Sequence, residues 1–187
     1  MDSFSYLSVL ISIILGLGIT QLVTGLGRLI QARDRVRMYW PAVEWTGLLL
    51  LIHVQTWWAM FGLRNVGDWT FAQFFVVLLQ PIVLSLLAAL VLPDINADTH
   101  ADLRASYYAQ SRWFFSLTVL LLIVSLVKDL MISGSLPAPL NVAAHVMFMI
   151  LAAGGIATRN ERYHAVVAPI AIALVLVYIG LLFTRLA

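Results

Sequence analysis

The 187-residue chain contains no cysteine and few charged residues. Without cysteine there is no disulfide framework, no thiolate metal ligand and no cysteine nucleophile. Charged residues make up 11% of the chain and hydrophobic residues 62%, whereas a soluble domain averages about 25% charged and about 45–50% apolar residues. The composition excludes an ordinary soluble domain and favours an all-α integral membrane protein. We expect the lipid bilayer to be its partner, and we expect no nucleic acid.

Motifs for catalysis and nucleotide binding are also missing. The sequence has no H-E-x-x-H or H-x-x-x-H pair for a metal hydrolase and no G-x-S-x-G turn for a serine nucleophile. Gly16 and Gly18 lie inside an apolar stretch, not between a strand and a helix, so they do not predict a phosphate-binding loop. We therefore expect no catalytic residues and no metal site, and an enzyme is the less favoured class.

Six long apolar runs separated by polar breaks are the strongest positive signal. Each is long enough, at about 1.5 Å per residue, to cross a hydrocarbon layer of about 30 Å. They predict a single six-helix transmembrane domain over residues 1–187, with helices at 4–30, 41–63, 70–92, 113–132, 139–157 and 165–184. Because three is an odd number, helices four to six run opposite to the first three, which is the geometry of an inverted 3+3 arrangement.

The longest break, residues 93–112, is expected to be a cytoplasmic loop. Asp98 or Thr99 suits the N-cap of a short amphipathic helix that ends at Arg112. An alternative for the same loop is a divalent-cation site formed by His100, Asp94, Asp98 and Asp102.

Positive charge is distributed unevenly among the breaks. One side of the predicted bundle carries eight arginines, which are Arg28, Arg33, Arg35, Arg37, Arg104, Arg112, Arg159 and Arg162. The other side carries Arg64, Lys128 and Arg185. Since cytoplasmic loops are rich in lysine and arginine, we expect the first loop in the cytoplasm and both termini outside, in the inner (plasma) membrane of a bacterium.

Small and hydroxyl side chains follow one face of the first predicted helix. Their spacing of three or four residues places these positions on one stripe: Ser5, Ser8, Ser12, Gly16, Thr20, Thr24 and Gly27. Gly18 and Gly25 lie almost opposite Gly16 and Gly27. A helix with two close-packing faces has neighbours on both sides, so a homo-oligomer is expected.

Few polar groups fall inside the predicted spans, and they mark candidate functional positions because polar groups in lipid are costly. Gln55 shares a face of the second helix with Glu44 and Gly62, whereas His53 lies on the opposite face. From such faces we predict a path lined by Ser12, Thr20, Thr24, His53, Gln55, Gln73, Gln80, Asp129, Asn141 and His145.

The fourth and fifth helices each present a polar face. Thr118, Ser125 and Asp129 align on the fourth helix. A heptad-like seam on the fifth helix is formed by Asn141, His145, Phe148, Ala152 and Gly155. Lys128 and Asp129 are expected to form a pair at the outer edge of the membrane, where the long lysine side chain reaches the interface.

Three functions fit these features. The first is a multi-pass membrane protein that passes an ion or small solute through a polar path between helices. The second is a non-transporting scaffold or complex subunit, in which the same faces only pack. The third is a b-type haem protein using His53 and His145 as axial ligands; no other cofactor is predicted.

Overall fold

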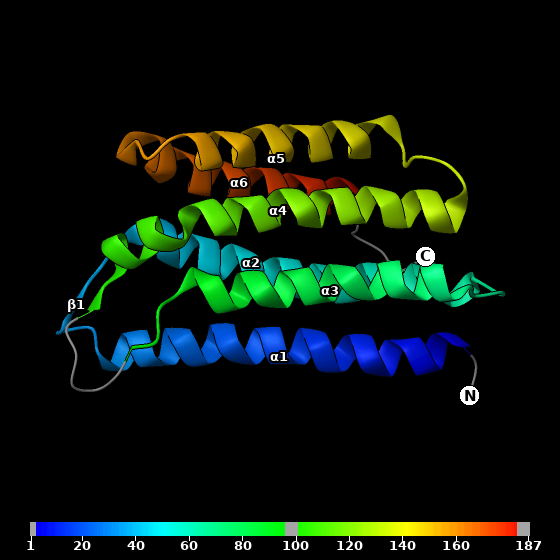
Figure 1. Cartoon of the computed structure of the whole chain (residues 1–187), viewed down its shortest axis with the longest axis horizontal. Helices are drawn as coiled ribbons and strands as arrows, with labels where there is room; N and C mark the ends of the chain where they lie inside the picture. The colour runs from blue at the N-terminus through cyan, green and yellow to red at the C-terminus, as the bar shows by residue number, and fades with distance from the viewer. Residues whose placement is uncertain (1–2, 96–100, 183–187) are drawn as a thin grey trace.

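The computed structural model describes residues 3–95 and 101–182, which form six long helices and two short strands (Figure 1). The helices are α1 (Ser3–Gln31), α2 (Trp40–Met60), α3 (Phe71–Val91), α4 (Leu103–Ser133), α5 (Pro139–Ala157) and α6 (Glu161–Leu182). A 3-10 turn, η1 (Phe61–Asn65), extends α2. In these described ranges all six helices are long and apolar enough to cross a membrane, and the predicted number of helices and the helical fold are confirmed.

Two short strands close one end of the bundle. β1 (Val36–Arg37) pairs in parallel with β2 (Ala101–Asp102), and Val36 lies opposite Ala101. This pair joins the connection between α1 and α2 to the start of α4 at the left of Figure 1. We call this the β end of the bundle, and the opposite end, where α4 turns into α5, the α4–α5 end.

α4 is longer at its start than the sequence pattern predicted. The Asp102 carboxylate accepts hydrogen bonds from the N–H groups of Arg104 and Ala105 at 2.9 and 3.0 Å, so Asp102 caps the helix. Residues 103–112 are therefore the first turns of α4, and the connection after α3 is shorter than the predicted loop at 93–112. The predicted cap and cation-site residues that lie outside the described residues are Asp98, Thr99 and His100.

A tight turn at the other end of α4 brings α4 and α5 side by side. Gly134 adopts φ +70°, a left-handed conformation that glycine tolerates best, and its N–H donates to the Leu130 carbonyl at 3.0 Å. The chain then reverses into α5, which begins at Pro139. The polar faces predicted on the fourth and fifth helices are thereby brought together.

The first three helices pack against one another, with Leu15 and Leu22 of α1 and Leu84 of α3 each at most 1% exposed. α4 packs on α3 and α5, whereas α6 packs chiefly on α2. The two halves of the chain are therefore packed differently, and an inverted 3+3 relation between them stays a prediction.

The middle of the small-residue stripe of α1 lies on the exposed surface of the bundle. Gly18 and Gly25 point inward, toward His53 and Leu92, while Gly16 and Gly27 have no atom within 4 Å of the place that a β-carbon would occupy. The stripe members in the middle of α1 are exposed, and these are Ser12, Gly16, Thr20 and Thr24. The two opposite faces expected of this helix are present, but the stripe does not face the interior.

The β end carries the arginines that were counted in the sequence, and several of them bridge different segments. Arg28 pairs with Asp94 at 3.0 Å, and Arg37 pairs with Asp102 at 3.3 Å. Arg104 of α4 pairs with Glu161 of α6 at 2.8 Å. These ion pairs occupy Asp94 and Asp102, two of the acids considered above for a cation site.

Candidate functional site

A cavity of about 420 Å³ lies between α2, α4, α5 and α6, with Gln80 of α3 also on its wall. This volume is within the range of about 300–1,000 Å³ that small-molecule sites occupy. Along α4 the lining extends from Thr118 to Ser133, which is about 22 Å at 1.5 Å per residue. The cavity therefore follows most of a hydrocarbon thickness of about 30 Å.

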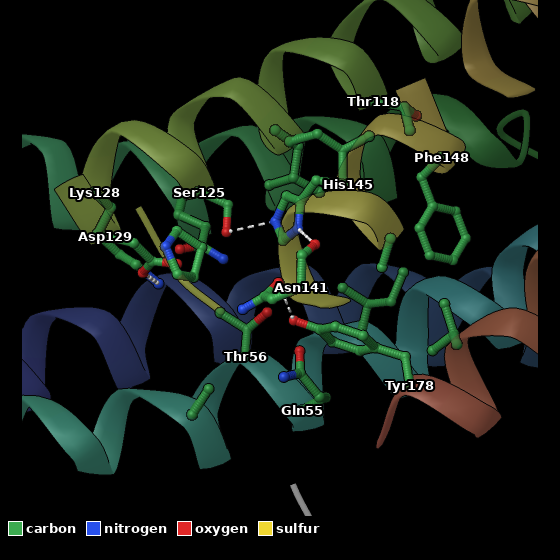
Figure 2. Close-up of a pocket in the computed structure, with 18 of the residues that line it drawn as sticks. Gln55, Thr56, Thr118, Ser125, Lys128, Asp129, Asn141, His145, Phe148 and Tyr178 are labelled. Atoms are coloured by element: carbon green, nitrogen blue, oxygen red, sulfur yellow. Dashed lines mark hydrogen bonds and ion pairs between the residues drawn. The ribbon is translucent and has the colours of Figure 1, made fainter. Parts of the chain in front are cut away.

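An ion pair lies in the part of the cavity near the α4–α5 end. Lys128 Nζ is 3.3 Å from Asp129 Oδ1, and the two side chains are only 13% and 27% exposed. Figure 2 shows both residues beside the polar groups of α5. The pair is near the end of its helix, as the sequence predicted, but both residues line the cavity.

His145 is held on the cavity wall by two hydrogen bonds (Figure 2). Its Nδ1 lies 2.9 Å from the main-chain carbonyl of Asn141. A carbonyl only accepts, so Nδ1 donates this bond, and Nε2 lies 3.1 Å from Ser125 Oγ, a hydroxyl that can donate or accept. Both ring nitrogens of His145 are thus engaged in hydrogen bonds.

The contact between Ser125 and His145 places a hydroxyl beside a base, which raises the question of covalent catalysis. Acyl transfer also needs donors aimed at the developing oxyanion. Ser125 lies within the continuous helix α4, whose backbone N–H groups are used in helix hydrogen bonds, so its own turn offers no such donor pair. We interpret the contact as one that joins α4 to α5.

Asn141 and Tyr178 extend the polar wall toward α6. The Tyr178 hydroxyl donates to Asn141 Oδ1 at 3.0 Å, and Gln55 and Thr56 of α2 lie near this pair in Figure 2. Tyr178 was not among the residues predicted from the sequence. The available signal was a tyrosine hydroxyl inside an otherwise apolar run, which needs a polar partner when it is buried.

Gln80 has an unsatisfied acceptor on the cavity wall. Its Oε1 is buried and has no hydrogen-bond partner within the part of the chain that the structure describes. Leaving a buried acceptor unpaired costs about 1–3 kcal/mol. This oxygen is therefore available to a donor on a molecule that enters the cavity.

An aromatic layer closes the cavity toward the β end. We use this name for Trp45, Phe114 and Phe115, whose rings meet edge to face with the Trp45 centroid 5.3 and 5.5 Å from the two phenylalanine centroids. Phe115 is fully buried, and Trp45 is 7% exposed. The cavity thus ends at this layer in the conformation described.

Behind the aromatic layer lies a second buried histidine, His164, which is fully buried. Its Nε2 donates to the Thr158 carbonyl and its Nδ1 accepts from the Tyr107 hydroxyl, both at 2.9 Å. Burial raises the pKa of the neighbouring Tyr39, whose hydroxyl is 3.0 Å from that of Tyr108. His164 was missed because it lies in a short polar segment that the sequence pattern assigned to a break between helices.

The ten predicted path residues divide into two groups. Five of them line the cavity, and these are Gln55, Gln80, Asp129, Asn141 and His145. Five others lie outside the cavity, and these are Ser12, Thr20, Thr24, His53 and Gln73. Half of the predicted path residues therefore line one cavity.

His53 is fully buried on the side of α2 that faces α1 and α3. Its Nδ1 donates to the Leu49 carbonyl at 2.7 Å, and its Nε2 has no hydrogen-bond partner among the described residues. His145 faces the cavity on the other side of α2. Because the two histidines do not line a common space, the arrangement lends no support to a haem held between them.

Gln73 has a local structural role. It forms a capping box with Thr70 at the start of α3, and its Nε2 donates to the Met131 carbonyl of α4 at 3.0 Å. On α1, Ser12 accepts from Trp57 Nε1 at 3.1 Å, and Thr20 donates to the Gly16 carbonyl at 2.7 Å. Thr24 lines a separate hollow near the β end, between α1, α3 and α4.

Within residues 3–95 and 101–182, no group of three or more histidine, aspartate or glutamate side chains is placed to hold a metal ion. Comparison with known proteins finds no match to this chain among family models, curated proteins or solved structures.

Proposed function

We propose that the chain is an integral membrane protein that binds a small solute in the cavity and passes it across the bilayer. The six helices have the length and apolar composition of membrane spans. Eight arginines lie at the β end, which supports a cytoplasmic β end with both termini outside, in a bacterial inner membrane.

The observation that carries the proposal is the cavity itself. Polar side chains from α2, α3, α4, α5 and α6 converge on a space that follows α4 for about 22 Å. A bundle that only needed to pack would fill this volume with side chains, because protein interiors are normally close-packed. The aromatic layer ends the cavity, so passage requires a rearrangement that opens it toward the β end.

A pair of neighbouring alanines on α5 tests the proposal. Ala144 lines the cavity, whereas Ala143 is exposed on the outer surface of α5. We expect Ala144→Phe to fill the cavity and abolish uptake, and Ala143→Phe to retain it. Uptake by proteoliposomes is measured by mass spectrometry, from a mixture of isotopically labelled amino acids, sugars and organic acids.

Two outcomes would overturn this function. Wild-type proteoliposomes that accumulate no more solute than protein-free liposomes would exclude passage of these solutes. Equal uptake by the wild type and Ala144→Phe, with the variant shown to be folded by its unfolding transition, would exclude the cavity as the route.

A second candidate, a subunit that assembles with other copies without transporting, is favoured by the outward face of α1. Gly16 and Gly27 have open space around them, and small side chains let membrane helices approach closely. We propose that this face meets the same face of a second copy. Because the chain has no cysteine, Gly16→Cys is expected to form a disulfide dimer in native membranes, and Ile150→Cys on the exposed face of α5 is expected to stay monomeric.

A further inference from the structure

The cavity has a polar part and an apolar part. Toward the α4–α5 end its wall carries Lys128, Asp129 and Asn141. Toward the aromatic layer the wall is mostly apolar, because the Thr118 hydroxyl there is bonded to the Phe114 carbonyl and the other lining residues include Leu48, Leu121, Phe148, Ala152 and Ala171. A molecule that fills this space has a polar head and an apolar body, which lies toward Trp45.

The lysine and carboxylate charges on the described lining residues cancel. Lys128 carries the positive charge and Asp129 the negative one, and the two side chains form an ion pair. A ligand with a net charge would bring an unbalanced charge beside two side chains that are only 13% and 27% exposed, which is costly. A ligand with one positive and one negative group keeps the sum at zero.

The ion pair also offers complementary partners to such a ligand. Lys128 and Asp129 are neighbours in the sequence, and their charged groups lie 3.3 Å apart. Lys128 can therefore bind a ligand carboxylate in place of Asp129, and Asp129 can bind a ligand ammonium group in place of Lys128. Charge-assisted hydrogen bonds of this kind are among the strong ones. Gln80 Oε1, which has no partner among the described residues, is an additional acceptor for an N–H donor.

We propose that the cavity takes a zwitterionic amino acid with an apolar side chain, its carboxylate at Lys128 and its ammonium at Asp129. This inference rests on the proposed function and specifies the class of solute. The apolar side chain of the ligand lies against Phe148 and points toward the aromatic layer. An amine or a carboxylate alone leaves one member of the ion pair without compensation.

Three probes that share a phenyl ring on a two-carbon chain test the charge requirement. Phenylalanine is the zwitterion, 3-phenylpropanoate lacks the amino group, and 2-phenylethylamine lacks the carboxylate. Isothermal titration of the purified full chain in nanodiscs is expected to show phenylalanine binding at least about tenfold more tightly than either analogue.

Single variants are expected to change the preference in opposite directions. Asp129→Asn removes the negative charge, so it weakens phenylalanine binding at least about tenfold and favours 3-phenylpropanoate. Lys128→Met weakens phenylalanine binding and favours 2-phenylethylamine. Asp68→Asn, which alters an exposed residue in the connection between α2 and α3, leaves all three affinities unchanged.

A measurement on the unaltered protein covers the case in which a variant fails to fold. Lys128 is the only lysine of the chain. Phenylalanine is expected to slow acylation of Lys128 by an amine-reactive reagent at least about tenfold, read by mass spectrometry of the peptide that contains it. The analogues are expected to protect it less.

The results separate failure of this inference from failure of the proposed function. If an analogue binds and protects as well as phenylalanine, or if none of the three does so, the zwitterion inference is overturned. The proposed function then still stands wherever uptake of some other solute is lost in Ala144→Phe. It falls with the inference when uptake is absent as well, or when a folded Ala144→Phe takes up solute as well as the wild type does.

Discussion

Gly18 of α1 lies directly against the imidazole of His53 on α2. A β-carbon at position 18 would overlap His53 Nε2 and would come within 3.1 Å of Ser85 Oγ on α3. His53 has little freedom to move away, because its Nδ1 is bonded to the Leu49 carbonyl and its side chain is fully buried. The absence of a side chain at Gly18 thus permits the contact among α1, α2 and α3.

The first prediction concerns this contact. Gly18→Ala is expected to lower the free energy of unfolding by about 1–3 kcal/mol, the range typical of overpacking a filled interior. Gly16→Ala is the matched control on the same helix, because nothing lies within 4 Å of its β-carbon position. Unfolding in detergent gives both values, and equal stability of the two variants would contradict the close contact.

Much of this arrangement could be predicted from helical periodicity. The angle of 100° per residue placed His53 and Gln55 on opposite sides of the second helix, and the structure has His53 against α1 and Gln55 on the cavity. The same rule aligned Ser125 with Asp129 and Asn141 with His145, all of which line the cavity. Periodicity says which residues of one helix share a face.

Periodicity could not say which face of each helix points inward. The stripe on α1 was assigned to the path, but α1 turns Leu15 and Leu22 toward its neighbours and leaves Thr20 exposed. In a bilayer both lipid and protein are apolar, so hydrophobicity alone does not orient a helix. Tyr178 was not predicted for a related reason, because only the packing of α6 brings its hydroxyl near Asn141.

The second prediction separates stability from function at Gln80. Gln80→Leu removes a buried acceptor that has no partner among the described residues, so the free energy of unfolding is expected to rise by about 1 kcal/mol. The same change removes an acceptor from the cavity wall, so solute uptake is expected to fall. A gain in stability together with a loss of activity is typical when a polar group that serves function is replaced.

Gln21→Leu is the control for this variant, because it makes the same change at an exposed position on α1. It is expected to alter uptake little. A loss of stability in Gln80→Leu would indicate that the amide has a structural partner and would argue against its proposed role as a free acceptor.

The third prediction concerns pH. The Ala105 N–H, with further help from the Arg104 N–H and the Arg37 guanidinium, holds the pKa of Asp102 below its ordinary value of 3.8. Because the folded-state pKa is the lower one, the Asp102 carboxylate stabilises the fold above pH 3.8, and this contribution is lost as the pH falls through the folded-state pKa.

Asp102→Asn is therefore expected to melt at a lower temperature than the wild type near neutral pH, and the gap should close on acidification. Asp68→Asn, at an exposed position in the α2–α3 connection, serves as the control. A gap between Asp102→Asn and the wild type that stays constant down to the most acidic pH would show that the charge of Asp102 contributes nothing to stability.

The fourth prediction concerns orientation in the membrane. Arg33 lies in the connection between α1 and α2 at the β end, and Asp68 lies at the α4–α5 end between α2 and α3. Because the chain has no cysteine, Arg33→Cys and Asp68→Cys each introduce a single reactive thiol. In intact bacterial cells, a membrane-impermeant maleimide is expected to label Asp68→Cys at once and Arg33→Cys only after lysis.

The expectation follows from the charge on the two ends, since cytoplasmic segments retain an excess of arginine. With the β end inside, the polar part of the cavity, which contains Lys128, lies toward the outer face, and the aromatic layer at Trp45 lies toward the cytoplasm. Solute would then enter from outside and be released only when that layer opens. Labelling of both thiols from the same side would exclude a membrane-spanning α2, and the reverse pattern would place the polar part of the cavity toward the cytoplasm.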